Sequence, residues 1–153
     1  MSAHTVFDFY IFIRYSSQLE RGAFRNKPAE YIVFMTFGCV NFLLWAYVLG
    51  LQFIHNSIST MMLYLWARKN PNNVVNFFDV FHFRSCFLPY FMLILIVLGG
   101  FDPTMDVLGS LAGHLYFYLE EIVPHIPETQ DYRLLKAPAS LKSFCDKIGI
   151  HNF

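Results

Sequence analysis

The stretch from Tyr31 to Phe53 constrains the fold most, because its apolar character is almost uninterrupted and Asn41 is its only strongly polar interior residue. A membrane-crossing helix needs roughly 20 apolar residues, so this stretch can cross a bilayer with some tilt. The composition agrees: 56% of the residues are hydrophobic and only 14% are charged, against about 25% charged residues in an average soluble domain. We therefore expect a polytopic membrane protein.

Apolar runs and turn residues divide the chain into about five membrane segments, at 5–17, 31–51, 53–67, 86–101 and 104–121. The predicted fold class is an all-α, polytopic membrane helix bundle, with a transmembrane core over 1–125 and a cytosolic tail over 126–153. The first segment is too short for a full crossing, so we expect it to be the last half of a helix whose beginning is short or missing.

Two further helices are predicted outside these segments. Apolar residues recur at helical spacing over 74–81, which predicts a short helix in the membrane interface. In the tail, an apolar stripe runs through Leu141, Phe144, Cys145 and Ile148, with lysines beside it. That pattern predicts a membrane-surface or partner-docking helix, and a frayed tail is the alternative.

The basic residues predict the orientation. All 11 Lys and Arg residues lie between Arg14, near the end of the first segment, and Lys27 in the loop that follows it, in the region before Cys86, or in the tail. The turns at 50–56 and 99–106 hold none. Because cytosolic loops are enriched in Lys and Arg, we expect these three regions and the C-terminus to be cytosolic.

Two glycines four residues apart, Gly109 and Gly113, lie in the last apolar segment. In water, a glycine inside a helix costs about 1 kcal/mol relative to alanine. In lipid, small residues at this spacing allow two helix backbones to approach closely, which favours helix association. We therefore predict that Gly109 and Gly113 pack this helix against another.

Polar residues gather in the segment at 53–67, which we expect to face protein or a water-filled groove rather than lipid. Asn41 is expected to hydrogen-bond a neighbouring helix, and His114 to be a satisfied interior histidine or an interfacial donor. The possible groove-lining polar residues are Asn41, His55, Asn56, Ser57, Ser59 and His114.

The residues give little support for catalysis. No serine lies in a Gly-x-Ser-Gly turn, although His55 and Ser59 could form a local i, i+4 pair. Asp106 is expected in a solvated helix start near the positive end of the helix dipole. No metal-ligand spacing is present, no cofactor is expected, and the zero net charge does not suggest nucleic acid. An intramembrane serine protease with a non-standard nucleophile and a small transporter or channel remain as alternatives.

Five segments, spread along the chain in the family's order, resemble the Derlin family of rhomboid-like pseudoproteases. They are Arg14–Phe24, Leu63–Pro71, Asn76–Phe78 with Phe87–Pro89, Gly109–Glu120 and Leu134–Pro138. The resemblance implies that the first membrane helix and lumenal loop of the family have no counterpart here. It also implies that Asp106 stands where active rhomboids hold their base histidine, so no catalytic residue is expected.

The resemblance further implies a role in endoplasmic-reticulum-associated degradation, as a multi-pass protein of the endoplasmic reticulum membrane with a cytosolic C-terminus. Such a protein would assist the retrotranslocation of misfolded lumenal and membrane proteins to the cytosol. The implied partners are a membrane-embedded ubiquitin ligase complex, misfolded clients and other Derlins in a homo- or hetero-oligomer. The family's glycine-rich docking motif for the cytosolic AAA ATPase is absent, so contact with that ATPase is expected to be indirect.

Overall fold

A computed structural model describes residues 3–50, 55–77, 79–128 and 136–148. The helices are α1 (Ala3–Arg21), α2 (Pro28–Leu49), α3 (His55–Lys69), α4 (Leu88–Leu98), α5 (Thr104–Phe117) and α6 (Ala139–Ile148). Two short strands, β1 (Val74–Phe77) and β2 (Phe81–Arg84), separate α3 from α4. Shorter helical turns are η1 (Ser85–Phe87), η2 (Tyr118–Ile122) and η3 (Val123–His125). The predicted all-α bundle is confirmed.

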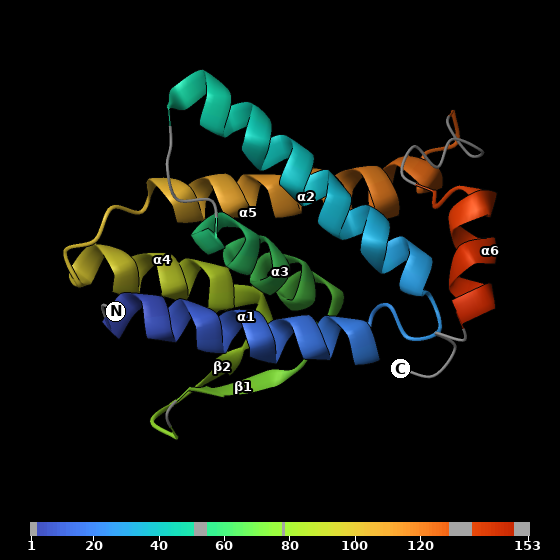
Figure 1. Cartoon of the computed structure of the whole chain (residues 1–153). Coiled ribbons are helices and arrows are strands. Elements are labelled where there is room, and N and C mark those ends of the chain that lie inside the picture. Colours follow the sequence, from blue (N-terminus) through green and yellow to red (C-terminus); the bar gives the residue numbers. More distant parts are fainter. Residues whose placement is uncertain (1–2, 51–54, 78, 129–135, 149–153) are drawn as a thin grey trace.

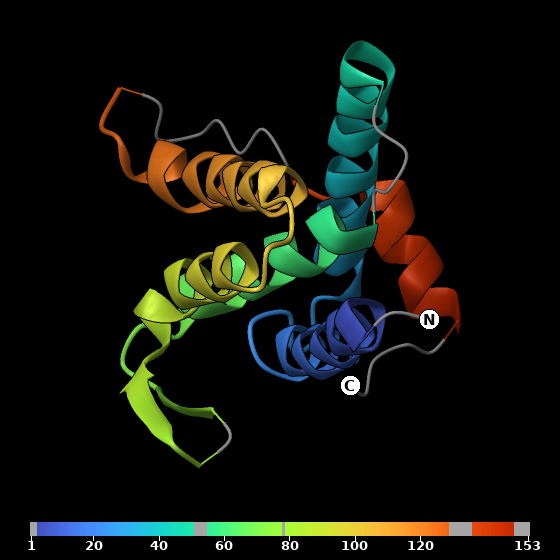
Figure 2. The same ribbon diagram turned by 90° about the vertical axis from the view of Figure 1, so that its left-hand side faces the viewer.

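Helix α3 is the centre of the bundle and contacts α1, α2, α4 and α5. Met61, Met62, Leu63 and Leu65 are each at most 1% exposed, so this helix is covered on several sides. Figures 1 and 2 show α5 beside α3 and parallel to it, and α1 on another side of α3. Aromatic rings fill the space around these contacts; for example, the centroids of Phe34 and Tyr116 lie 4.7 Å apart.

Helix ends follow from local backbone chemistry. Helix α2 begins with Pro28, whose fixed φ suits the first helical position and whose missing N–H is not needed there. The same helix ends at Gly50, whose φ of 66° is left-handed and whose N–H donates to the carbonyl of Ala46. Glycine adopts this conformation without steric cost, which explains the sharp stop at this point.

Helix α2 is, within the ranges that the structure describes, the one helix long and apolar enough to cross a membrane by length and composition. A shorter apolar helical stretch covers Ser85–Leu98. The outer half of α2 leaves large apolar side chains exposed, among them Val40, Leu43 and Val48.

The structure corrects the predicted interfacial helix over 74–81. Strands β1 and β2 form an antiparallel hairpin in which Val75 pairs with Phe83 and Asn76 with His82. Neighbouring β-branched residues, Val74 and Val75, favour extended backbone, and Asp79 adopts a left-handed φ of 55° in the turn. Val75 is buried against the bundle. Its side chain reaches the core because it lies on the inner face of a strand, and not because it belongs to the apolar face of a helix.

The loop between α1 and α2 contains a residue with a left-handed backbone conformation, and a substitution there tests whether this conformation is required. Asn26 is exposed and has a φ of 61°, which asparagine tolerates and β-branched residues do not. We expect Asn26→Val to lower the free energy of unfolding by about 1–2 kcal/mol, and Asn26→Gly to leave it unchanged or raise it. Thermal unfolding in detergent measures the difference. Arg25→Val is the control, because Arg25 is equally exposed and its φ is not positive; an equal loss in both valine variants would contradict the explanation.

Candidate functional site: the contact between α3 and α5

Gly109 lies where α5 approaches the backbone of α3. A Cβ atom built on Gly109 would lie 3.0 Å from the Cα of Ser57 and 3.0 Å from the Cβ of Thr60, and still closer to the carbonyl oxygen of Ser57. Backbone atoms cannot move aside as a flexible side chain can. Any side chain at this position would therefore push the two helices apart.

Gly113 repeats this contact one turn further along α5. A Cβ atom there would lie 3.0 Å from Cδ1 of Tyr64 and 3.1 Å from the carbonyl oxygen of Met61. Ala112 beside it is fully buried. Small residues on consecutive turns of α5 thus face α3, which is the arrangement that lets helices associate closely in lipid.

A buried hydrogen bond links the two helices at Asp106. The Thr60 hydroxyl donates to Oδ1 of Asp106 at 2.6 Å, and the two residues are 6% and 3% exposed. The expectation that Asp106 is solvated is therefore wrong. Its position in the first turn of α5, near the positive end of the helix dipole, remains as predicted, and the Thr60 donor compensates part of the cost of burial.

Ser57 makes the neighbouring interhelical bond. Its hydroxyl donates to the carbonyl oxygen of Met105 at 2.8 Å, and the residue is 2% exposed. Ser59 is 5% exposed on the same helix. A nucleophilic serine needs a base and an open approach for substrate. The Ser57 hydroxyl instead donates a hydrogen bond to a backbone carbonyl inside a packed contact.

His114 is held by Tyr64 near the other end of the contact. Nδ1 of His114 lies 2.7 Å from the Tyr64 hydroxyl, and Nε of Arg68 donates to the same hydroxyl at 3.0 Å. A guanidinium can only donate, so the Tyr64 oxygen accepts the hydrogen bond from Arg68. The Tyr64 hydroxyl can in turn donate a hydrogen bond to Nδ1 of His114. His114 is exposed, which disagrees with the expected interior histidine, and the other expectation, an interfacial donor, stays a prediction.

Other polar residues singled out by the sequence lie apart from this cluster. Asn41 donates to the carbonyl of Phe37 at 2.9 Å, so this hydrogen bond lies within its own helix and not to a neighbouring helix as predicted. Asn56 is half-buried in the first turn of α3, and the side chain of His55 lies outside the described residues. In the described part of the chain, no three His, Cys, Asp or Glu residues come together as metal ligands.

The turn before α5 positions Asp106. Asp102 accepts hydrogen bonds from the backbone N–H of Thr104 at 3.0 Å and from its hydroxyl at 2.5 Å. These two bonds stabilise the ionised carboxylate and hold the pKa of Asp102 below its usual range. The fixed turn starts α5 at Thr104, which places Asp106 one half-turn later, opposite Thr60.

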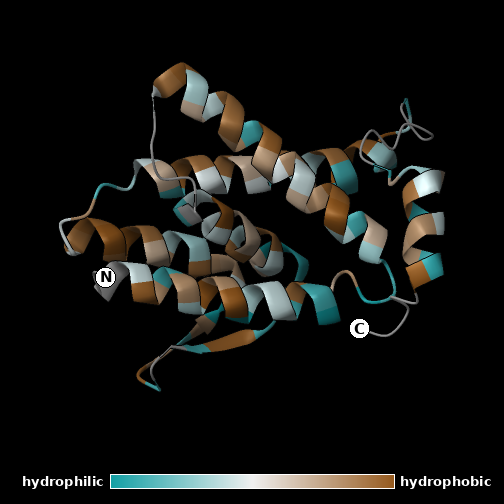
Figure 3. Ribbon diagram, in the orientation of Figure 1, coloured by the Kyte–Doolittle hydropathy of each residue, from teal (hydrophilic) through white to brown (hydrophobic). Residues whose placement is uncertain are grey.

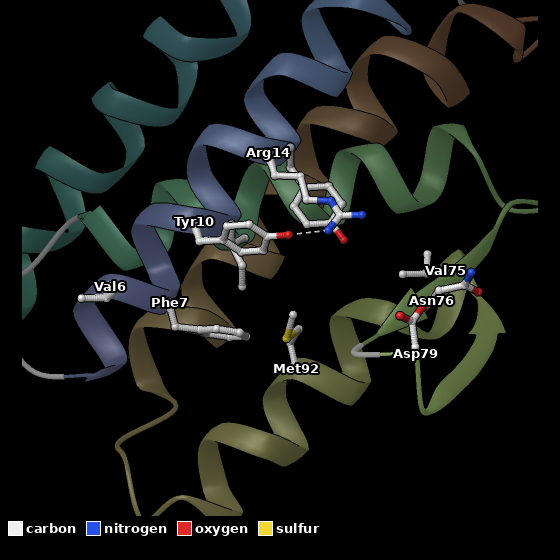
Figure 4. A pocket seen from close by; sticks show the side chains of 10 residues that line it. Val6, Phe7, Tyr10, Arg14, Val75, Asn76, Asp79 and Met92 are labelled. Atoms are coloured by element: carbon white, nitrogen blue, oxygen red, sulfur yellow. Dashed lines mark hydrogen bonds between the residues drawn. The ribbon is translucent and has the colours of Figure 1, made fainter.

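A groove of about 700 Å³ opens on another side of the bundle, between α1, the hairpin and α4 (Figure 4). Phe7, Ile11, Val75 and Met92 contribute apolar lining, and the exposed Arg14 lies at the groove. Arg14 donates to the Tyr10 hydroxyl at 2.5 Å. Sequence reasoning did not single out these residues, although a basic residue and a tyrosine four apart in an apolar segment are a usable signal.

Comparison with known proteins decides the family, because the model of the Der1-like family matches residues 1–139. The chain belongs to the Der1-like family. A probable derlin-2 homolog of Dictyostelium discoideum is 36% identical over 147 residues, which are 92% of this chain and 57% of that protein. Derlin-2.2 of Arabidopsis thaliana is 31% identical over 160 residues, 96% of this chain and 64% of that protein. The chain thus spans about three fifths of the length of these relatives.

The close approach at Gly109 predicts unequal effects of two glycine substitutions. Gly109→Ala places a methyl group against the backbone of Ser57, whereas at Gly38 the tight contacts of the added atom are with the flexible end of the Met61 side chain. We expect Gly109→Ala to destabilise the chain by about 1–3 kcal/mol, the usual cost of overpacking, and Gly38→Ala to cost less. Thermal unfolding in detergent and size-exclusion chromatography compare the two variants. A smaller effect at Gly109 than at Gly38 would contradict the proposed backbone contact.

The hydrogen bond from Thr60 to Asp106 predicts that two threonine substitutions differ in their effect on stability. Thr60→Val removes the donor to a buried carboxylate, and we expect it to lower the free energy of unfolding by about 1.5–3 kcal/mol. Thr36→Val is the matched control, since the Thr36 hydroxyl donates only to the Ile32 carbonyl of its own helix and is exposed. Its expected effect is within about 0.5 kcal/mol. Equal losses in the two variants, measured by thermal unfolding, would show that the interhelical bond contributes nothing.

Proposed function

We propose that this chain is a catalytically inactive, rhomboid-like component of endoplasmic-reticulum-associated degradation, which helps misfolded lumenal and membrane proteins to reach the cytosol. Membership of the Der1-like family supports the pathway. The proposed lack of catalytic activity is supported by the buried hydrogen bond between Thr60 and Asp106. By the rhomboid resemblance, Asp106 occupies the place of the base histidine, and a hydroxyl of the facing helix donates to it.

The proposed location is the endoplasmic reticulum membrane, crossed several times, with a cytosolic C-terminus. Exposed apolar side chains support a lipid setting: Val40, Leu43 and Val48 on α2, and Ile94, Val97 and Leu98 on α4. Figure 3 shows hydrophobic residues along α4 and the outer half of α2. A soluble protein rarely leaves such surfaces to water, because contiguous apolar patches promote aggregation.

The distribution of charge supports the orientation. Arg21 ends α1, and Arg68 and Lys69 end α3, and both helices finish at the same end of the bundle. The opposite end carries the turns after α2 and α4, at Gly50 and Gly99, which have no basic residues. Under the positive-inside rule, the basic end faces the cytosol.

The groove between α1 and α4 is the proposed place for a client segment. Its apolar lining suits hydrophobic side chains, and Arg14 together with the Tyr10 hydroxyl offers polar contacts beside them. A charged residue at the centre of a bilayer costs about 2.5–3.5 kcal/mol on insertion scales. A protein groove that supplies hydrogen-bonding groups lowers this barrier for the polar parts of an unfolded chain.

The proposed partners follow from the same role. They are misfolded clients, a membrane-embedded ubiquitin ligase complex, the cytosolic AAA ATPase reached indirectly, and other Derlins in a homo- or hetero-oligomer. The chain has no proposed cofactor, metal or catalytic residue.

Client turnover tests the proposal. Deletion of the gene is expected to slow the decay of a misfolded lumenal client, and the wild-type chain is expected to restore it. Ser57→Ala should restore decay in proportion to the amount of variant protein, because the Ser57 hydroxyl bonds a carbonyl and attacks nothing. Pulse-chase measurement of the client gives the rates.

The protease alternative predicts other outcomes. A serine-directed fluorophosphonate should label Ser57 or Ser59, and Ser57→Ala should abolish client decay although the variant accumulates normally. Either result would overturn the inactive role. Normal client decay in the deletion strain, with no second Derlin present to replace the chain, would overturn the role in degradation.

A further inference from the structure

Helix α6 carries an apolar flank that the bundle does not cover. Leu141 and Cys145 face α2, where Cys145 is 2% exposed and packs with Ala29 and Ala137. Phe144 and Ile148 lie beside this contact and are 59% and 54% exposed. They are four residues apart, so they form one continuous edge along the helix.

The contact with α2 fixes the height of α6 along the bundle. Helix α6 packs on Ala29 and Val33, which lie in the first two turns of the candidate membrane span Pro28–Leu49. Figures 1 and 2 show α6 running across the end of the bundle, at the end where α1 and α3 finish, rather than alongside α5. A helix in this place lies at the boundary between the apolar core and the basic end.

The charges on α6 suit a lipid headgroup region. Lys142 and Lys147 are exposed and lie on either side of the apolar stripe, at about 100° per residue around the helix. By the same geometry, Asp146 lies on nearly the opposite side from Phe144. Helices with apolar residues on one face and lysines at its borders bind in the plane of the membrane surface, more strongly where the lipids are anionic.

We propose that α6 lies in the headgroup region of the bilayer leaflet at the basic end of the bundle. Phe144 and Ile148 insert among the upper acyl chains, and Lys142 and Lys147 contact anionic headgroups. The occupant of this flank is lipid rather than a protein, because the contact with Val33 holds α6 at the depth of the second turn of the α2 span. The inference rests on the membrane placement in the proposed function.

Quenching of tryptophan by brominated phospholipids tests the inference in the full chain. Phe144→Trp, Ser143→Trp and Val40→Trp are each reconstituted into phosphatidylcholine and phosphatidylserine bilayers, and quenching is measured as the excess over the parent chain with Trp45 and Trp66. Phe144→Trp is expected to be quenched, most strongly by bromines near the headgroup, with its emission shifted to the blue. Ser143→Trp, on the far side of α6, is expected to show no excess.

The three variants separate the possible failures. If Val40→Trp is quenched and Phe144→Trp is not, the membrane placement holds and the inference about α6 is wrong. If Val40→Trp is also unquenched, the membrane placement itself fails. Equal quenching at Ser143 and Phe144 overturns the orientation of α6, since both sides would then lie in lipid. Ile148→Trp repeats the test if Phe144→Trp does not elute as a folded species.

Phosphatidylserine gives a second measurement with its own outcome. Omitting it should weaken the quenching of Phe144→Trp, and Lys142→Glu with Lys147→Glu should abolish that dependence on anionic lipid. Quenching that is identical with and without phosphatidylserine would overturn the proposed role of the two lysines.

Discussion

The close approach of α3 and α5 is the constraint on which the rest of the structure depends. Inside a bilayer the hydrophobic effect does not drive helices together, because lipid chains are as apolar as leucine. Association must come from backbone proximity and from interhelical bonds. Gly109 and Gly113 supply the proximity. Polar pairs then fix the register along the whole length, from Ser57 with Met105 to the ion pair of Lys69 and Glu121 at 2.6 Å.

The hydrogen bonds between α3 and α5 involve hydroxyl and carboxyl groups of the kind that an intramembrane protease would need for catalysis. The hydroxyls of Ser57 and Thr60 donate across the contact, and Asp106 accepts inside it. His114 is held by Tyr64 at a different turn of α5. In the proposed function this helix pair is a scaffold, and contacts with other molecules are assigned to other surfaces. In the described part of the chain, the surfaces proposed for these contacts are the groove beside Arg14 and the exposed flank of α6.

Local sequence patterns predicted the elements that depend on local rules. A long apolar run predicts α2, and two glycines at helical spacing predict a packed helix. The hairpin at 74–84 was missed because four apolar residues at helical spacing also fit two short strands joined by a turn, and only the tertiary contact of Val75 chooses between them. The burial of Asp106 was missed for a related reason: its donor, Thr60, is 46 residues away in sequence. The groove combines α1, β1 and α4, which no local pattern brings together.

In the proposed function, Arg14 is the residue through which the groove would contact polar chain segments. A guanidinium on a long apolar stem can reach toward the headgroups while its methylenes cover apolar surface. The Tyr10 hydroxyl accepts a hydrogen bond from one N–H group of Arg14, and the guanidinium has further N–H groups that could donate to the carbonyl of a client. Each net hydrogen bond contributes only about 0.5–1.5 kcal/mol, well below the cost of placing a charge at the bilayer centre. Under the proposal, one such site would lower the barrier only in part, and a shorter crossing distance would have to supply the remainder. In the proposed function that shorter distance would lie beside α4, because the apolar helical stretch Ser85–Leu98 is shorter than the candidate span Pro28–Leu49.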